Sequence, residues 1–156
     1  MKLATYHDGS RDGQLWVVSR DLARAVPAAS IASSMIEALE NWDRVASQLE
    51  ALSARLNAGK ELVATDFDPH RCLAPLPRAP QWLDASAFLN HGRLMDKAFN
   101  NPVNPDFEMI PLVYQGASDD FRGPLADVEF PDEALMIDME GEFGVIVGDV
   151  DMGTDA

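Results

Sequence analysis

Residues 137–147 read Ile-Asp-Met-Glu-Gly-Glu-Phe-Gly-Val-Ile-Val, and turn residues bound this stretch on both sides. Apolar and β-branched residues recur in it with a period of two, which predicts a β-strand. Because alternate side chains of a strand share a face, we expect Asp138, Glu140 and Glu142 to point the same way. Stacked carboxylates on a mostly apolar strand are unfavourable unless a cation lies among them. A divalent metal that prefers oxygen ligands is the simplest such cation.

Composition places the chain among globular proteins and excludes several classes of partner. With 156 residues, 47% of them hydrophobic and 24% charged, it is long enough for one domain or one and a half. No apolar run approaches the roughly 20 residues of a membrane helix, and residues 1–8 lack the apolar stretch that is typical of a signal peptide. The net charge of −14 argues against nucleic acid or an anionic membrane as a partner. A single cysteine, Cys72, excludes an intrachain disulfide and fits a passive thiol in a reducing cytoplasm.

The first half of the chain shows a hairpin pattern followed by a helical pattern. Two short strands, Lys2–Tyr6 and Gln14–Val18, are predicted on either side of a turn that contains two glycines. Ser30 and Ser33 are candidate N-caps of the helical region, with Glu37 near its N-terminal end.

A longer helix is predicted from residue 42 onward, because its apolar residues recur at intervals of three and four. Asn57-Ala58-Gly59 is a typical helix end. We favour packing of the apolar stripe within its own domain over a partner interface. The stripe consists of Trp42, Val45, Leu49, Leu52 and Leu56.

Four prolines between Asp66 and Pro80 predict an extended linker, because proline removes backbone donors and disfavours helix in the preceding residues. We place a domain boundary near residue 72, which divides the chain into an N-terminal domain, 1–72, and a second domain, 73–156. Beyond the linker we expect a strand or loop at Trp82–Phe88, a helix at Asn90–Phe99, a strand at Met109–Gln115, a polar loop at Gly116–Pro124 and the acidic strand at Ala134–Val147.

These elements predict an α+β protein. A small N-terminal domain of short strands and helices precedes the beginning of a mixed, β-rich domain.

Two further groups of residues could carry chemistry. Asp84 precedes the helix at residues 90–99, and His91 lies near its start. A histidine can act as a general base near neutrality, and an aspartate can bind metal, although each also occurs in structural roles such as capping. Tyr114 ends a predicted strand and enters a loop of small polar groups that suits the oxygens of a substrate. A buried tyrosine before an ordinary turn is the alternative.

Together these residues resemble the fumarylacetoacetate hydrolase family, whose enzymes act on 1,3-diketo and 2-oxo acids. The family signature has an aspartate, a histidine seven positions on, and a later Glu-x-Glu pair in a strand. Here that pattern reads Asp84, His91 and Glu140-Gly141-Glu142. Tyr114, in Tyr-Gln-Gly-Ala-Ser, matches the substrate-side tyrosine of the family. The resemblance covers about residues 73–150, with a weaker match to the small preceding domain.

The resemblance implies a set of roles. Asp84, Glu140 and Glu142 would bind Mg²⁺, Mn²⁺ or Ca²⁺, which would chelate the keto and carboxylate oxygens of the substrate. His91 would activate water for attack on a carbonyl, and the carbon leaving group would depart as an enolate. Ser86 stands where the family often has a tyrosine, on the substrate side. The resemblance also implies a homodimer with a small-molecule diketo or 2-oxo acid substrate.

Alternatives to hydrolysis remain within this resemblance and outside it. Isomerases, hydratases and decarboxylases of 2-oxo acids in the same family use similar ligands. A hypothesis from a different functional class is a non-catalytic binding or dimerisation module, in which the acidic residues serve solubility alone. Because family members continue well past the position of Ala156, we expect this chain to be an N-terminal portion that lacks turnover and binds metal weakly.

Overall fold

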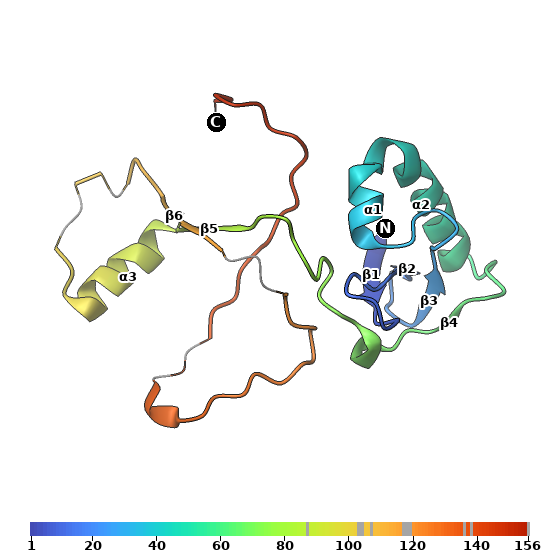
Figure 1. The fold of residues 1–156 in the computed structure, drawn as a ribbon, viewed down its shortest axis with the longest axis horizontal. Coiled ribbons are helices and arrows are strands. Elements are labelled where there is room, and N and C mark those ends of the chain that lie inside the picture. Colours follow the sequence, from blue (N-terminus) through green and yellow to red (C-terminus); the bar gives the residue numbers. More distant parts are fainter. Residues whose placement is uncertain are drawn as a thin grey trace. The chain divides into compact units, whose positions relative to one another are not determined.

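The chain forms two units, which we describe separately: Met1–Ala126 and Asp127–Ala156. Figure 1 shows the computed structural model, which describes residues 1–86, 88–102, 105–106, 108–116, 120–135, 137 and 139–155. Strands and helices both occur in the first unit, so the predicted α+β class is confirmed. None of the helices in the described ranges is both long and apolar enough to cross a bilayer.

An antiparallel sheet of four strands organises the N-terminal part of the first unit (Figure 1). Its strands follow chain order: β1 (Lys2–Tyr6), β2 (Gln14–Val18), β3 (Arg24–Pro27) and β4 (Thr65–Asp66). The predicted hairpin of the first two strands is confirmed at all four of its ends. Its turn closes at Gly13, which has a φ of +62°, and a Cβ there would lie 2.7 Å from a carbonyl oxygen of β1. Only glycine fits this position without strain.

The short helix α1 (Met35–Glu40) begins at an N-cap that differs from the predicted ones. Ser34 is the N-cap, and its Oγ accepts a hydrogen bond from the backbone N–H of Glu37 at 3.3 Å. The prediction of Ser30 or Ser33 is therefore wrong. Ser33 instead donates its N–H and its hydroxyl to the Glu37 carboxylate, so the next serine is the one left to satisfy the helix N–H groups.

The long helix α2 (Trp42–Asn57) begins and ends where the sequence predicts. Gly59 has a φ of +69°, which lets the chain turn back over the last helical turn. The N–H of Gly59 donates to the carbonyl of Leu56, and the N–H of Lys60 donates to the carbonyl of Arg55, both at 3.0 Å. These two bonds satisfy carbonyls that the helix itself leaves without a partner.

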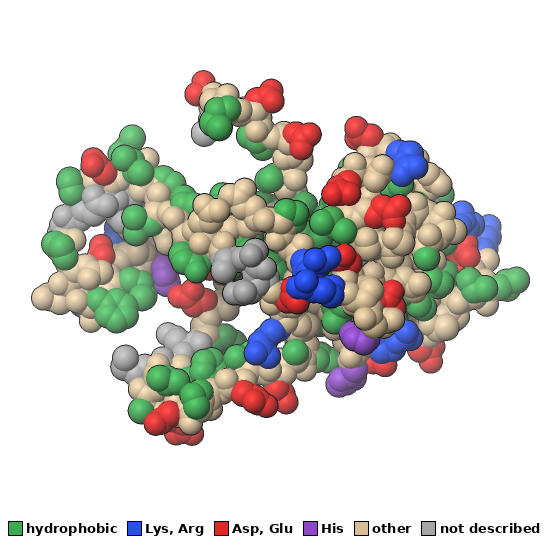
Figure 2. Space-filling model, viewed as in Figure 1, with side chains coloured by type: hydrophobic (Ala, Val, Ile, Leu, Met, Phe, Trp, Pro, Cys, Tyr) green, Lys and Arg blue, Asp and Glu red, His purple; other side chains and the backbone are tan. Residues whose placement is uncertain are grey.

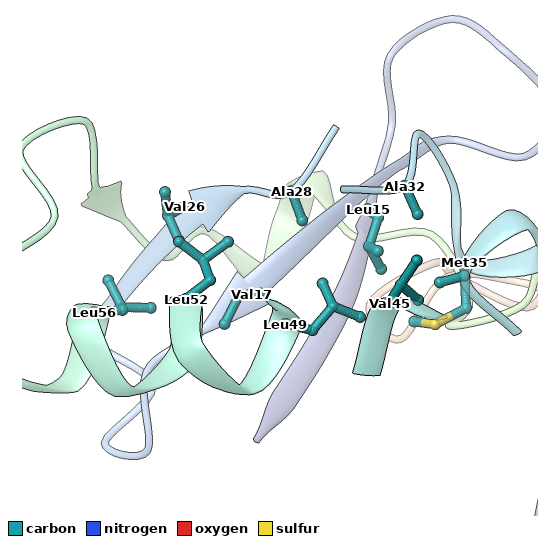
Figure 3. Packing of buried hydrophobic residues seen from close by; sticks show 11 residues of the cluster. Leu15, Val17, Val26, Ala28, Ala32, Met35, Val45, Leu49, Leu52 and Leu56 are labelled. Carbon is teal, nitrogen blue, oxygen red and sulfur yellow. The ribbon is translucent and has the colours of Figure 1, made fainter. Parts of the chain in front are cut away.

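One face of α2 covers the sheet and forms the main core. Figure 3 shows leucine and valine side chains of α2 directed at apolar side chains of β2 and β3. The predicted stripe is buried at Val45, Leu49, Leu52 and Leu56, whereas Trp42 at the first position of the helix is 38% exposed. The other buried members of this cluster are Leu15, Val17, Val26, Ala28, Ala32, Met35 and Ala38.

The proline-rich segment 66–80 packs along β1. Leu73 donates its N–H to the carbonyl of Thr5 at 2.9 Å, and the hydroxyl of Thr5 donates to the carbonyl of Pro75 at 2.6 Å. The segment contains one 3-10 turn, Pro69–Arg71, and otherwise no helix, as its prolines predict. The hydrogen bonds to Thr5 hold the proline-rich segment against β1. The predicted boundary near residue 72 stays a prediction.

Hydrogen bonding lowers the pKa values of three surface carboxylates of this sheet-and-helix domain. Asp8, Asp21 and Glu37 each accept a serine hydroxyl and a backbone N–H, so their pKa values lie below the ordinary values of 3.8, 3.8 and 4.5. Because the pKa values of these carboxylates are lower in the folded than in the unfolded state, the contacts stabilise the fold fully at a pH above the unfolded-state pKa values. This stabilisation is lost as the pH falls through the folded-state pKa values.

We therefore expect the urea midpoint of the domain to fall as the pH is lowered from about 5 to about 3. Replacing Glu37 with glutamine should reduce this pH dependence, because the carboxylate that Ser33 stabilises is gone. Glu50→Gln, at an exposed position of α2, is the matched control and should keep the wild-type pH dependence. Far-UV circular dichroism in urea gives the midpoint of each variant at each pH. If the midpoint depends on pH to the same extent in both variants, the Glu37 carboxylate does not contribute to the pH dependence.

Candidate functional site

A separate two-stranded sheet holds three of the predicted site residues. β5 (Leu83–Ser86) pairs antiparallel with β6 (Leu112–Gln115). The strand predicted over Met109–Gln115 is confirmed in its last four residues. The stretch Trp82–Phe88, for which strand and loop were both open, contains a strand of four residues.

The register of this pair places Asp84 directly opposite Tyr114 and Ser86 opposite Leu112. Directly opposed residues share a face of the sheet and have Cβ atoms about 4.5–5.5 Å apart. Asp84 and Ser86 also share a face with each other, because they alternate along β5. The structure therefore brings Asp84, Ser86 and Tyr114 onto one face. Asp84 is half-buried, and Tyr114 is 59% exposed.

Trp82 packs beside these residues. Its ring centroid lies 5.7 Å from that of Tyr114 and 5.5 Å from that of Phe121, both pairs tilted at 59°. Gly116 donates its N–H to the carbonyl of Trp82 at 3.0 Å, and a Cβ on Gly116 would lie 1.8 Å from the Trp82 ring. Trp82 was not among the predicted site residues. The signal was its position two residues before Asp84, the spacing at which strand residues share a face.

His91 lies in the first turn of α3 (Leu89–Phe99) and is exposed. The predicted helix at 90–99 is confirmed, and it begins three residues after β5 ends. The helix follows β5 directly in the chain, and His91 belongs to the same unit as Asp84 and Tyr114.

Glu140 and Glu142 lie in the second unit, where the described residues form no strand. The acidic strand predicted at Ala134–Val147 is therefore wrong for its described part, because its first two residues belong to a 3-10 turn, Glu133–Leu135, and the other described residues form no strand. Asp138 lies outside the described residues. Phe143 is 98% exposed and Val145 is 84% exposed. A strand is stable when a neighbour accepts and donates its backbone hydrogen bonds, and none of the described strands pairs with this segment.

The residues that the structure describes hold no group of three or more His, Cys, Asp or Glu side chains that could bind a metal ion. Asp84 belongs to the first unit and the two glutamates to the second, so the ligand set of Asp84, Glu140 and Glu142 stays a prediction. The donor chemistry around Asp84 fits the expected ions. The Asp84 carboxylate is an oxygen donor of the type that Mg²⁺, Mn²⁺ and Ca²⁺ prefer, and the hydroxyl groups of Ser86 and Tyr114 on the same face can hydrogen-bond a substrate.

Cys72 has the character of a passive thiol. Burial raises the pKa of the thiol, and the neighbouring Asp68 carboxylate raises it further. The Sγ atom donates to the carbonyl of Asp68 at 3.9 Å. A thiol of raised pKa holds little of the thiolate that nucleophilic chemistry requires.

The N-terminal half of the chain matches a known protein family. The pattern of the family described as "Fumarylacetoacetase N-terminal domain 2" matches residues 1–78, which include the four-stranded sheet, α1, α2 and most of the proline-rich segment. None of the curated proteins compared with the chain matches it. Because the family match covers half of the 156 residues, the chain belongs to the fumarylacetoacetase family through this N-terminal domain.

Proposed function

We propose that this chain supplies metal-binding and substrate-binding residues to a hydrolase that cleaves C–C bonds of 1,3-diketo acids of the fumarylacetoacetate or acylpyruvate type. The observation that carries the proposal is the pairing of Asp84 with Tyr114 on one face of β5 and β6, with Ser86 beside them. This face follows an N-terminal domain of the fumarylacetoacetase family along the same chain.

Each residue has a role in this proposal. Asp84, Glu140 and Glu142 would hold Mg²⁺, Mn²⁺ or Ca²⁺, and the bound ion would polarise the oxygens of the substrate. The hydroxyl groups of Tyr114 and Ser86 would hydrogen-bond and orient the same substrate. His91 would take a proton from the attacking water. The water oxygen would form a bond to the carbonyl carbon of the substrate. The adjacent C–C bond would then break, and its electron pair would leave with the carbon fragment as an enolate that is protonated afterwards.

A substrate panel tests the proposal on the protein expressed from its complete reading frame. With Mg²⁺ or Mn²⁺ present, we expect an acylpyruvate to give pyruvate and a carboxylic acid. We expect His91→Asn to lower kcat by about 10²–10⁴-fold, the usual contribution of a general base. His70→Asn, at another exposed histidine, is the matched control and should leave kcat unchanged.

The same panel separates the alternatives. Release of carbon dioxide from a 2-oxo diacid, or addition of water to an unsaturated 2-oxo acid, in place of acylpyruvate hydrolysis would assign a decarboxylase or a hydratase. Interconversion of 2-oxo acid isomers without cleavage would assign an isomerase. Each of these results contradicts the hydrolase.

Exposed apolar side chains favour a second candidate, a dimerisation module. Leu94 and Phe99 on α3 are 58% and 66% exposed, and Leu112 and Val113 on β6 are 62% and 55% exposed. Figure 2 shows hydrophobic side chains over much of the visible surface around α3. Clusters of exposed apolar side chains are typical of interaction sites. A homodimer without turnover on any substrate of the panel would support the module over the enzyme.

A further inference from the structure

Two ion pairs reach from the turn of the first hairpin to residues far along the chain. Arg11 places Nη2 3.0 and 3.3 Å from the two carboxylate oxygens of Asp120. The neighbouring Asp12 accepts both arms of the Arg78 guanidinium, with Nε–Oδ1 at 3.0 Å and Nη2–Oδ2 at 2.6 Å. The Arg78–Asp12 contact joins two nitrogens to two oxygens, which is the strongest and most directional form of arginine–carboxylate contact, whereas Arg11 donates to both oxygens of Asp120 from one nitrogen. The hairpin turn is therefore joined by ion pairs to Arg78, 66 positions after Asp12, and to Asp120, 109 positions after Arg11.

The backbone around Asp120 lies against the proline-rich segment. The N–H of Phe121 donates to the carbonyl of Pro77 at 2.8 Å. A Cβ on Gly123 would lie 2.6 Å from the carbonyl oxygen of Cys72, so the two main chains touch there. Because this proline-rich segment is itself bonded to β1, residues 120–123 are held by the N-terminal domain at several points.

Phe121 also contacts the candidate site. Its ring packs on Trp82, and Trp82 packs on Tyr114, with the ring centroids 5.5 and 5.7 Å apart. Aromatic pairs of this geometry stabilise a fold by more than their buried area accounts for, and each ring restricts the rotamers of the other. A continuous series of contacts thus runs from Arg11 through Asp120, Phe121 and Trp82 to Tyr114.

We propose that the hairpin turn of the N-terminal domain positions Tyr114 for the substrate, through the Arg11–Asp120 ion pair and the rings of Phe121 and Trp82. Arg11 and Trp82 are positioning residues in this proposal, since they act through Tyr114. The consequence for the substrate rests on the proposed function. Orientation matters because a misplacement of about 1 Å in a site can lower a rate by about 10²-fold.

Hydrogen exchange of the 156-residue chain tests the coupling without a substrate. Arg11→Asp places a second carboxylate beside Asp120. We expect amides in peptides covering 112–123 to exchange roughly fivefold faster, the upper range for loss of an exposed ion pair. The double variant Arg11→Asp/Asp120→Arg restores the opposite charges and should return the exchange to the wild-type rate. Arg55→Asp breaks an ion pair with Glu61 elsewhere in the domain and is the matched control, with exchange at 112–123 unchanged.

A binding experiment separates this proposal from the proposed function. In titrations of the protein expressed from its complete reading frame with oxalate in the presence of Mn²⁺, we expect Arg11→Asp to weaken oxalate binding and to leave the affinity for Mn²⁺ alone unchanged. If the wild-type protein binds no oxalate in this titration, the proposed function fails, and the exchange rates alone decide the positioning role. Unchanged exchange in Arg11→Asp, or a double variant that fails to restore it, overturns the positioning role.

Discussion

Leu49→Ala is expected to lower the free energy of unfolding of the N-terminal domain by about 3 kcal/mol. The side chain of Leu49 is 0% exposed and lies in the cluster that joins α2 to the sheet (Figure 3). Removing its three outer carbon atoms loses the gain from burial and leaves a cavity that a packed core fills only in part. At roughly 0.05–0.15 kcal/mol per residue, a domain of this size has a total stability of about 4–12 kcal/mol. The expected loss is a large fraction of it.

Urea unfolding of the 156-residue chain, followed by far-UV circular dichroism, measures this loss. A domain of this size should also melt on the order of 15 °C lower. Leu62→Ala is the matched control, because the same atoms are removed from a side chain that is 97% exposed, and it should change stability by less than about 0.5 kcal/mol. Equal losses at the two positions would show that Leu49 is not part of a packed core.

The N-terminal domain was predicted well because its main elements are encoded by neighbouring residues. The hairpin depends on a turn that Gly13 closes at positive φ, and the end of α2 depends on Gly59 in the same way. The buried stripe of α2 follows from a spacing of three and four along one helix. Each of these sequence features lies close in the chain to the element that it predicts.

Two local details were missed because neighbouring residues compete for the same role. Either Ser33 or Ser34 has the chemistry of an N-cap, and the Glu37 carboxylate engages Ser33 and leaves Ser34 to cap α1. Trp42 has the spacing of the buried stripe but lies at the first residue of α2, where only part of its side chain is covered. Sequence spacing identifies the candidates in both cases, and packing selects among them.

The candidate site depends on contacts between distant residues. The sequence predicted Asp84 and Tyr114 as site residues, yet only the register of β5 against β6 places them opposite each other. A slip of one residue would move one of them to the other face. The role of Trp82 was missed for the same reason, because its partners Tyr114 and Phe121 follow it by 32 and 39 positions.

The acidic segment shows what a period of two can and cannot predict. Alternation over 137–147 says which residues would share a face if the segment were a strand. It does not supply the neighbouring strand that the backbone hydrogen bonds require, and the described part of the segment has no such neighbour. Mutual repulsion opposes pairing as well, since residues 127–156 include ten Asp and Glu residues and no Lys or Arg.

The double variant Glu140→Gln/Glu142→Gln is expected to lower both Mn²⁺ affinity and hydrolytic activity by at least about 100-fold in the protein expressed from its complete reading frame. Changes to residues that only support the ligands of a metal already cost about 10–100-fold. Glutamine keeps the shape of each side chain and removes the charge that a divalent cation requires. The dimerisation module predicts instead that oligomeric state and metal affinity hardly change.

Charge alone must be separated from coordination, because a segment this acidic attracts any divalent cation. Glu129→Gln/Glu133→Gln removes the same two charges from the same unit at positions outside the Glu-x-Glu pair. Diffuse attraction depends on total charge and is screened by salt, so it would weaken equally in the two double variants and fade at high ionic strength. Coordination depends on particular oxygens. A large loss confined to the Glu140 and Glu142 variant, and retained in high salt, would therefore identify this pair as ligands, whereas equal losses would remove the metal site from the proposed function.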